Sequence, residues 1–278
     1  GRQDDHQINL DLLRAIRAAV KRVSPEAYLI GENFFEATDQ LQGDGWDAVM
    51  NYTGFADPIL HWLKCYEQDA LGCEAVLKAD FPWDTATMLQ AWNENLASIP
   101  WQIALQQFNL LDSHDTPRLL TLLDGDKALS RLAAIVQFTF PGVPCLYYGD
   151  EIGLTDEEGF ASRNCFPWDE GQWDQEALSF YRKLIAFRRE SLALARGEFR
   201  ILYFEKDLVV LARVLGEEWV LVTANRSEQA HPAVRLEVPT LNLPGEREFK
   251  ALFGSGCIEA GNGWLALPQI PKGGEVWH

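Results

Sequence analysis

The chain has 278 residues, with 24 Lys and Arg against 41 Asp and Glu, so its formal net charge is −17. Hydrophobic residues make up 47% and charged residues 23%, a globular composition that excludes wholesale disorder and collagen-like repeats. Because phosphate contacts need clustered Lys and Arg, the acidic balance argues against a nucleic-acid partner or an anionic membrane surface. The most apolar stretch, 132–148, contains two prolines and is shorter than the roughly 20 residues that span a bilayer.

The first predicted elements are a helix and a buried strand. Apolar residues at spacings of three and four predict a helix over 10–23, which the Ser-Pro pair at 24–25 ends. The short apolar run 27–30 that follows is typical of a buried parallel strand, and it leads directly to Gly31 and Glu32.

The same order of an apolar run and then polar residues recurs three times. The runs are 48–50, 108–111 and 143–148, and they lead to Asn51, His114-Asp115 and Gly149-Asp150. Predicted helices lie between and after them, including 129–138 and 174–190. Strand-helix alternation with functional groups after the strands is typical of an α/β barrel. Only four such strands precede residue 198, whereas a closed barrel has eight.

After Gly197 the pattern changes to short β-rich runs. They cover 201–204, 208–214 and 219–224, with a hairpin turn at 215–218. No long helix is evident beyond them. We therefore expect two domains, a barrel part over 1–198 and a small antiparallel β domain over 199–278.

The candidate site consists of Glu32, His114 and Asp115, which follow two predicted strands of one sheet. Taken singly, Glu32 reads as a surface residue, and His114-Asp115 reads as a hydrogen-bonded His beside a capping Asp. Together they place carboxylates on one rim, and glycoside hydrolysis needs such a pair, one as a proton donor and one at the oxocarbenium-like centre.

Three stretches carry a resemblance to a known family. They are Leu-Ile-Gly-Glu-Asn at 29–33, Asn-Leu-Leu-Asp-Ser-His-Asp-Thr-Pro-Arg at 109–118, and 141–151, which begins Pro-Gly-Val-Pro. The chain resembles the C-terminal half of the α-amylase superfamily of retaining glycoside hydrolases. Stretches 31–34 and 164–168 favour the maltodextrin glucosidase subgroup, with neopullulanase and cyclomaltodextrinase as near alternatives. The resemblance implies the C-terminal half of a (β/α)8 TIM barrel followed by an antiparallel β-sandwich.

The resemblance also implies roles for residues. Glu32 would be the general acid/base, Asp115 the transition-state stabiliser, and His114 a ligand of sugar hydroxyls. Tyr52 and Arg118 are further substrate-binding candidates, although Arg118 can equally hold its loop in place. Other aromatic candidates for stacking on sugar rings, each with core packing as its alternative, are Trp62, Trp83, Trp92 and Trp168. The expected substrate is a maltodextrin or related α-glucan, with no cofactor.

The sequence departs from the family at the nucleophile. The family's Asp lies at the end of the fourth strand in a Gly-x-Arg-x-Asp motif, which is absent; residues 1–5 look like the loop just beyond that strand. We therefore expect the nucleophile upstream, in the missing N-terminal half of the same protein. The alternative is a non-catalytic carbohydrate-binding or interaction protein, and a homodimer is a further expectation.

The five cysteines are odd in number and form no Cys-x-x-Cys pair, which favours free thiols in a reducing cytoplasm. The five histidines are dispersed, so we expect no metal site.

Overall fold

Four short parallel strands form the part of the fold that carries the site. The computed structural model describes residues 2–64, 82–156, 162–243 and 245–278. The strands are β1 (Ile30–Gly31), β2 (Ala48–Val49), β3 (Phe108–Asn109) and β4 (Val143–Pro144). β1 pairs with β2 and β3 with β4, and a Met50–Phe108 bridge joins the two pairs. All of these pairings are parallel, as we expected for part of an α/β barrel.

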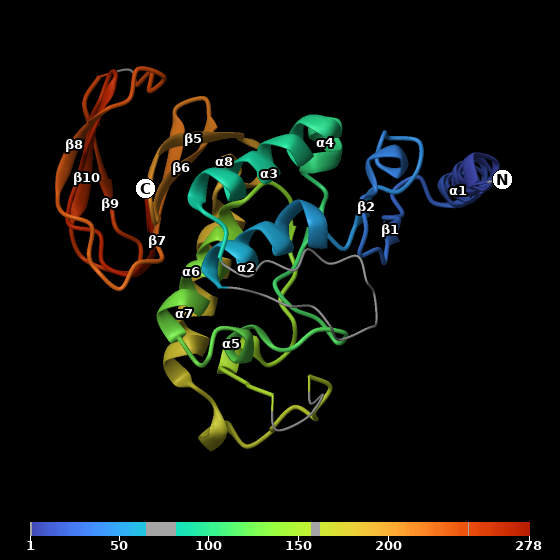
Figure 1. Ribbon diagram of the computed structural model, residues 1–278, viewed down its shortest axis with the longest axis horizontal. Coiled ribbons are helices and arrows are strands. Elements are labelled where there is room, and N and C mark those ends of the chain that lie inside the picture. The colour runs from blue at the N-terminus through green and yellow to red at the C-terminus, as the bar shows by residue number, and fades with distance from the viewer. Residues whose placement is uncertain (1, 65–81, 157–161, 244) are drawn as a thin grey trace.

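Helices lie between the strands and beside them (Figure 1). In chain order the α-helices are α1 (Arg2–Val23), α2 (Asp57–Leu63), α3 (Thr85–Ser98), α4 (Trp101–Ala104), α5 (Leu119–Leu122), α6 (Lys127–Thr139), α7 (Gln175–Glu190) and α8 (Leu192–Arg196). Single turns are η1 (Thr38–Gln40), η2 (Tyr52–Ala56), η3 (Asp150–Ile152) and η4 (Glu170–Gln172). Asp84, Asp126 and Asp174 start α3, α6 and α7, because each side chain accepts a first-turn backbone N–H.

Helix α1 differs from its prediction. It begins at Arg2 rather than near residue 10. Residues 2–5, which we expected in a loop, are therefore helical. It lies beside β1 and β2, at the end of the molecule opposite the C-terminus (Figure 1). Ile8, Leu12 and Ile16, four residues apart, are 63%, 58% and 40% exposed. Among the described helices, none combines the length and apolarity that a bilayer crossing requires.

The C-terminal region is two antiparallel four-stranded sheets, which confirms the predicted β-sandwich. One sheet has the order β12-β7-β6-β5 and the other β8-β11-β10-β9. The strands are β5 (Glu198–Glu205), β6 (Leu208–Leu215), β7 (Glu218–Asn225), β8 (Val234–Glu237), β9 (Arg247–Lys250), β10 (Cys257–Gly261), β11 (Trp264–Leu267) and β12 (Gly273–Trp277). Gly216, with φ of 59°, makes the tight turn between β6 and β7.

The sheet that contains β6 and β7 is buried on both faces. Val209 and Leu211 pack into the core shared with the helices, whereas Val210 and Ala212 pack into the core between the two sheets. Helix α6 covers the first face, against β12 and β7. This explains why β6 reads as a continuous apolar run rather than an alternating one.

The cysteines in the described part of the chain are free thiols. Cys145 and Cys257 are half-buried, and Cys165 is exposed. Cys65 and Cys73 lie outside the described residues.

Candidate active site

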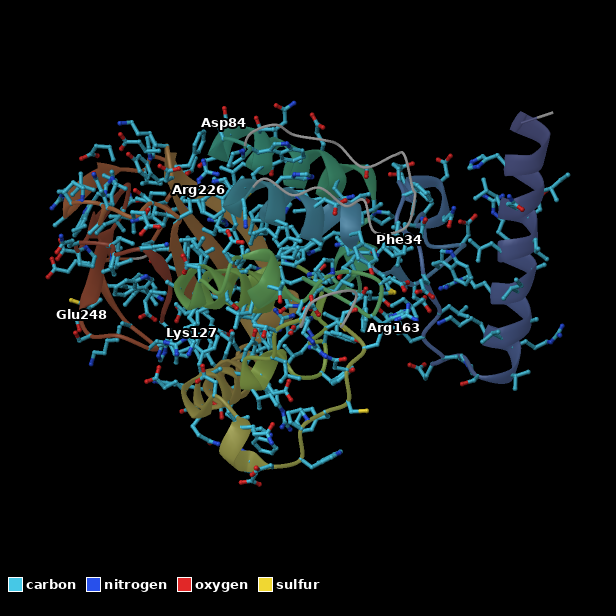
Figure 2. All side chains as sticks on the ribbon, turned by 60° about the horizontal axis from the view of Figure 1, so that its bottom comes forward. Phe34, Asp84, Lys127, Arg163, Arg226 and Glu248 are labelled. Carbon is cyan, nitrogen blue, oxygen red and sulfur yellow. The ribbon has the colours of Figure 1, made fainter. Side chains whose placement is uncertain are left out.

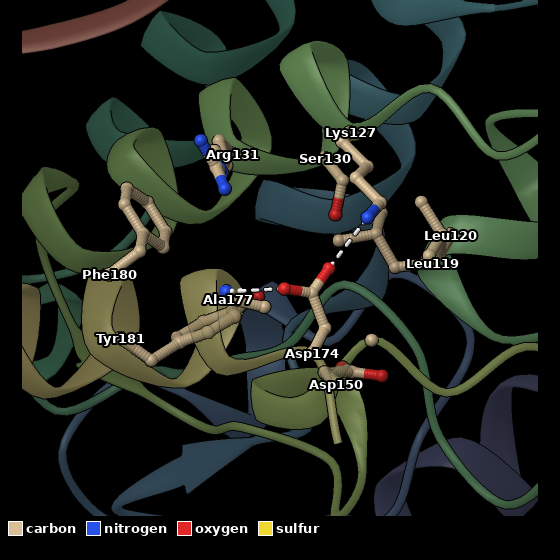
Figure 3. Close-up of a pocket in the computed structure, with 11 residues that line it drawn as sticks. Leu119, Leu120, Lys127, Ser130, Arg131, Asp150, Asp174, Ala177, Phe180 and Tyr181 are labelled. Atoms are coloured by element: carbon tan, nitrogen blue, oxygen red, sulfur yellow. Dashed lines mark hydrogen bonds and ion pairs between the residues drawn. The ribbon is translucent and has the colours of Figure 1, made fainter. Parts of the chain in front are cut away.

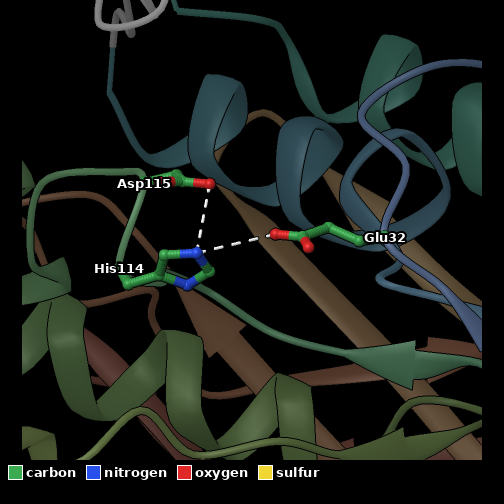
Figure 4. A group of neighbouring side chains, drawn as sticks. All are labelled: Glu32, His114 and Asp115. Atoms are coloured by element: carbon green, nitrogen blue, oxygen red, sulfur yellow. Dashed lines mark ion pairs between the residues drawn. The ribbon is translucent and has the colours of Figure 1, made fainter.

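The structure brings Glu32, His114 and Asp115 together. Glu32 directly follows β1, and the other two lie in the loop after β3, so parallel pairing places them at the same edge of the array. His114 Nε2 lies 3.6 Å from Glu32 Oε1 and 3.3 Å from Asp115 Oδ2 (Figure 4). One donor atom from each side chain lies within 4.8 Å of the other two. This is the shared rim that the sequence predicts.

The cluster is open to solvent on one side. The side chains of Glu32 and His114 are 56% and 47% exposed, whereas Asp115 is only 17% exposed. A ligand can therefore reach the Glu carboxyl and the imidazole, while the Asp carboxyl is held more deeply.

Arg163 completes the cluster, and the sequence reasoning missed it. Its Nη2 lies 2.5 Å from Asp115 Oδ1, and its Nε donates to the His114 carbonyl at 2.8 Å. Figure 2 shows Arg163 on the side of the molecule where Phe34 lies. The planar guanidinium suits a carboxylate and a carbonyl together, so it fixes the loop as well as balancing its charge. The only signal was its place directly before the family-like stretch 164–168.

Hydrogen bonds within the loop orient Asp115. Ser113 N donates to Thr116 Oγ1 at 2.8 Å, and Asp115 N donates to Ser113 Oγ at 3.1 Å. The Tyr52 hydroxyl donates to the same Ser113 oxygen at 2.8 Å. The loop is therefore tied to the segment after β2 as well as to itself.

Tyr52 is a buried residue that contacts the loop of the site. Its ring is 3% exposed and stacks on Phe34 with 4.2 Å between ring centroids. Burial raises the pKa of Tyr52 well above its usual value, so the hydroxyl remains a donor. The predicted direct contact with substrate does not fit this burial, because no face of the ring is free.

Arg118 is fully buried, so direct contact with substrate does not fit it either. Its guanidinium donates to the carbonyls of Tyr148 and Ser162 at 2.7 and 3.1 Å. The structural alternative, that it holds its loop, fits these contacts. Among the aromatic candidates, Trp62 and Trp92 are core residues with no exposure, whereas Trp168 is 84% exposed.

The three clustered side chains also have the donor types of a metal site. Asp115 Oδ1 is already paired with the Arg163 guanidinium, however, so only one oxygen of that carboxylate is left to ligate a metal. The arrangement therefore suits proton transfer better than metal binding.

Comparisons with known proteins agree with this architecture. The family model "Alpha amylase, catalytic domain" matches residues 3–182. A cyclomaltodextrinase from a Bacillus species is 36% identical over 228 residues, and neopullulanase 2 from Thermoactinomyces vulgaris is 34% identical over 229. Each alignment covers 81% of this chain but only 38% and 36% of the relative. The chain thus spans little more than a third of these relatives.

A solved structure shows the same arrangement in three dimensions. The debranching enzyme of Nostoc punctiforme, in crystals soaked with acarbose, superposes with a TM-score of 0.77 at 32% identity. The match covers 95% of this chain and 53% of that one. Parallel strands with carboxylates at their ends, followed by a β-sandwich, define part of a barrel enzyme. The chain belongs to the α-amylase family, through its catalytic domain.

Proposed function

We propose that this chain supplies the acid/base side of the active site of a retaining glycoside hydrolase that cleaves α-glucosidic bonds of maltodextrins. The observation that carries the proposal is the approach of Glu32, His114 and Asp115 to within 4.8 Å at one rim. Glu32, the more exposed carboxyl, is the general acid/base. Asp115, fixed by Arg163, stabilises the transition state, and His114 binds a sugar hydroxyl.

The reaction has two steps. In the first, Glu32 gives its proton to the glycosidic oxygen while the bond to the anomeric carbon breaks and a nucleophilic carboxylate forms the glycosyl intermediate. In the second, Glu32 takes a proton from water, which attacks the anomeric carbon and releases the nucleophile. The role of the Asp115 carboxylate is to stabilise the positive charge that develops on the sugar ring.

The nucleophile is the component that the 278 residues do not provide in recognisable form. No Gly-x-Arg-x-Asp motif occurs in the sequence. We propose that an upstream half of the same protein provides it, and that the chain divides into residues 1–198 of the barrel and residues 199–278 of the sandwich. A cytoplasmic location, proposed from the free thiols, completes this interpretation.

A second candidate activity acts on cyclic or branched α-glucans. The names of the relatives favour it, since they include cyclomaltodextrinases and a neopullulanase. Initial rates on maltotriose, a cyclodextrin and pullulan, measured side by side, separate it from a maltodextrin glucosidase.

The proposal is tested by glucose release from maltotriose. We expect none from residues 1–278 alone and measurable release from a protein that also contains the upstream half. If neither protein cleaves any of the three glucans but both bind them, the chain is a carbohydrate-binding protein. Robust cleavage by residues 1–278 alone would mean that the nucleophile lies within this sequence.

A further inference from the structure

The candidate site has two parts, and they meet where β2 joins β3. Glu32 follows β1, which pairs with β2, whereas His114 and Asp115 follow β3, which pairs with β4. Each of these strand pairs is two residues long, but among the described residues β2 and β3 are joined by a single bridge, between Met50 and Phe108. The separation between the two parts of the site therefore depends on the shortest pairing in the array.

Two buried amide side chains reinforce this joint. Asn51, directly after the bridge, donates from Nδ2 to Asn109 Oδ1 at 2.8 Å, and Asn109 donates from its own Nδ2 to the Pro141 carbonyl at 2.9 Å. Asn51 is 5% exposed and Asn109 is 0% exposed. The backbone N–H of Asn51 also donates to the Phe108 carbonyl at 2.9 Å. A chain of side-chain hydrogen bonds therefore runs from the end of β2, through β3, to the turn before β4.

The donors in this chain can point in one direction only. A carbonyl oxygen only accepts, so Asn109 must turn its NH2 to Pro141 and its Oδ1 to Asn51, which must then supply the donor. Gly142, with φ of 126°, permits the close approach, because a Cβ there would lie 2.5 Å from Asn109 Nδ2. Rotation of either amide would leave buried polar groups without partners, which is costly. The chain thus holds β2 and β3 in one relative position.

The segment 50–52 contacts both parts of the candidate site. Its first residue donates a backbone N–H at 2.9 Å to the carbonyl of Gly31, which directly precedes Glu32. Its last residue, Tyr52, donates its hydroxyl at 2.8 Å to the loop that carries Asp115. The hydrogen bond between the two Asn side chains lies between these contacts in the chain, at the joint itself.

We propose that Asn51 and Asn109 are positioning residues, whose amide-to-amide hydrogen bond sets the separation between the two parts of the candidate site. Both side chains are buried, so they act through β2 and β3. Their importance for catalysis rests on the proposed glycosidase function, but their role in placing the loop does not.

Amide hydrogen exchange of the 278-residue chain, followed by NMR, tests this placement without catalysis. In Asn51→Leu, which is close in size but removes the donor, the Asp115 amide should exchange at least about tenfold faster, because the loop then opens more easily. The amide of Val222, in the middle of β7, should not change. Asn109→Leu should give a similar increase, and the double variant should add little, since each change removes the same hydrogen bond.

Asp174→Ala is the matched control for a purely structural loss. Asp174 caps α7 and pairs with Lys127 at 2.7 Å, as Figure 3 shows. Its replacement should lower the free energy of unfolding but leave the exchange of the Asp115 amide as in the wild type. In the protein with its upstream half, Asn51→Leu should lower kcat for maltotriose at least about tenfold with KM little changed, because misplaced groups cost most in the transition state.

Three results overturn the proposal. They are unchanged exchange of the Asp115 amide in Asn51→Leu, an equal increase in Asp174→Ala, and rapid exchange of the side-chain NH2 protons of Asn51 and Asn109 in the wild type. The last needs no variant, so a variant that fails to fold leaves the test intact. Absence of cleavage by the protein with its upstream half, with the exchange effect present, contradicts the proposed function alone.

Discussion

The parallel array and the β-sandwich divide the work of the molecule between them. Strands β1 to β4 are two residues long, and the polar groups of the candidate site lie in the segments that follow β1 and β3. Strands β5, β6 and β7 have eight residues each, and the sheet they form is packed on both faces. Short strands with long loops position side chains, whereas the long paired strands bury apolar surface.

The residues expected to carry the chemistry are therefore different from the residues that stabilise the fold. The side chains of Glu32 and His114 are about half exposed, so their removal leaves no cavity. Leu211 and Leu221 are 3% and 0% exposed, and the two cores that contain them do not include Glu32, His114 or Asp115. We therefore expect changes at the rim to lower activity without lowering stability, and changes in the sheet to do the reverse.

The largest expected effect is on activity at the rim. In the protein with its upstream half, Glu32→Gln should lower kcat for maltotriose by about 10²–10⁴-fold, because the amide neither donates nor accepts the catalytic proton. The free energy of unfolding, measured with urea, should stay within about 0.5 kcal/mol of the wild type, since the side chain is exposed. Glu36→Gln, in the same segment, is the matched control. Near-normal turnover by Glu32→Gln would move the acid role to another residue.

How much of this site the sequence could predict depends on the range of the interactions. Glu32, His114 and Asp115 are predictable because each follows a short apolar run, and parallel strands bring their ends to one edge. Arg163 is not predictable in this way. It reaches Asp115 from a loop 48 residues further along the chain, and no periodicity encodes that return.

Burial accounts for the other differences. Arg118 and Tyr52 carry the same functional groups whether they face solvent or the interior, so their motifs do not reveal that both are covered. Trp62 and Trp92 match the composition of a sugar-binding surface but pack in the core. The β-sandwich can be predicted from the sequence, because its hairpin and its apolar runs are local features of the chain.

The second expected effect is on the stability of the doubly buried sheet. Leu211→Ala empties a site that faces the helices, and Leu221→Ala empties one between the two sheets. Each should lower the free energy of unfolding by about 2–5 kcal/mol in urea titrations. Leu215→Ala, at the 39% exposed end of β6, should change it by no more than about 0.5 kcal/mol. A sheet that buried one face only would lose stability in just one of the two core variants.

The smallest expected effect lies where the two regions meet. Asp126 caps α6 and pairs with Lys272 from the loop before β12. Burial opposes its charge, but hydrogen bonds from Lys272 and from Leu129 N outweigh this and lower the pKa of Asp126. A lowered folded-state pKa stabilises the protein above the unfolded value of about 3.9, and this contribution is lost as the pH falls through the folded value.

Asp126→Ala should therefore cost about 0.5–2 kcal/mol at neutral pH, as the loss of a capping carboxylate does. The difference from the wild type should shrink as the pH falls below the unfolded value of about 3.9 and through the lower folded-state pKa, because the wild-type carboxylate then loses its charge. Asp126→Asn keeps a capping oxygen but loses the charge that attracts Lys272, so it should lie between the two. Urea titrations of the three proteins, at neutral pH and again in acid below the unfolded pKa, measure these free energies of unfolding. If the loss of unfolding free energy in Asp126→Ala does not change with pH, the charge of Asp126 does not contribute to this contact between the barrel part and the sandwich.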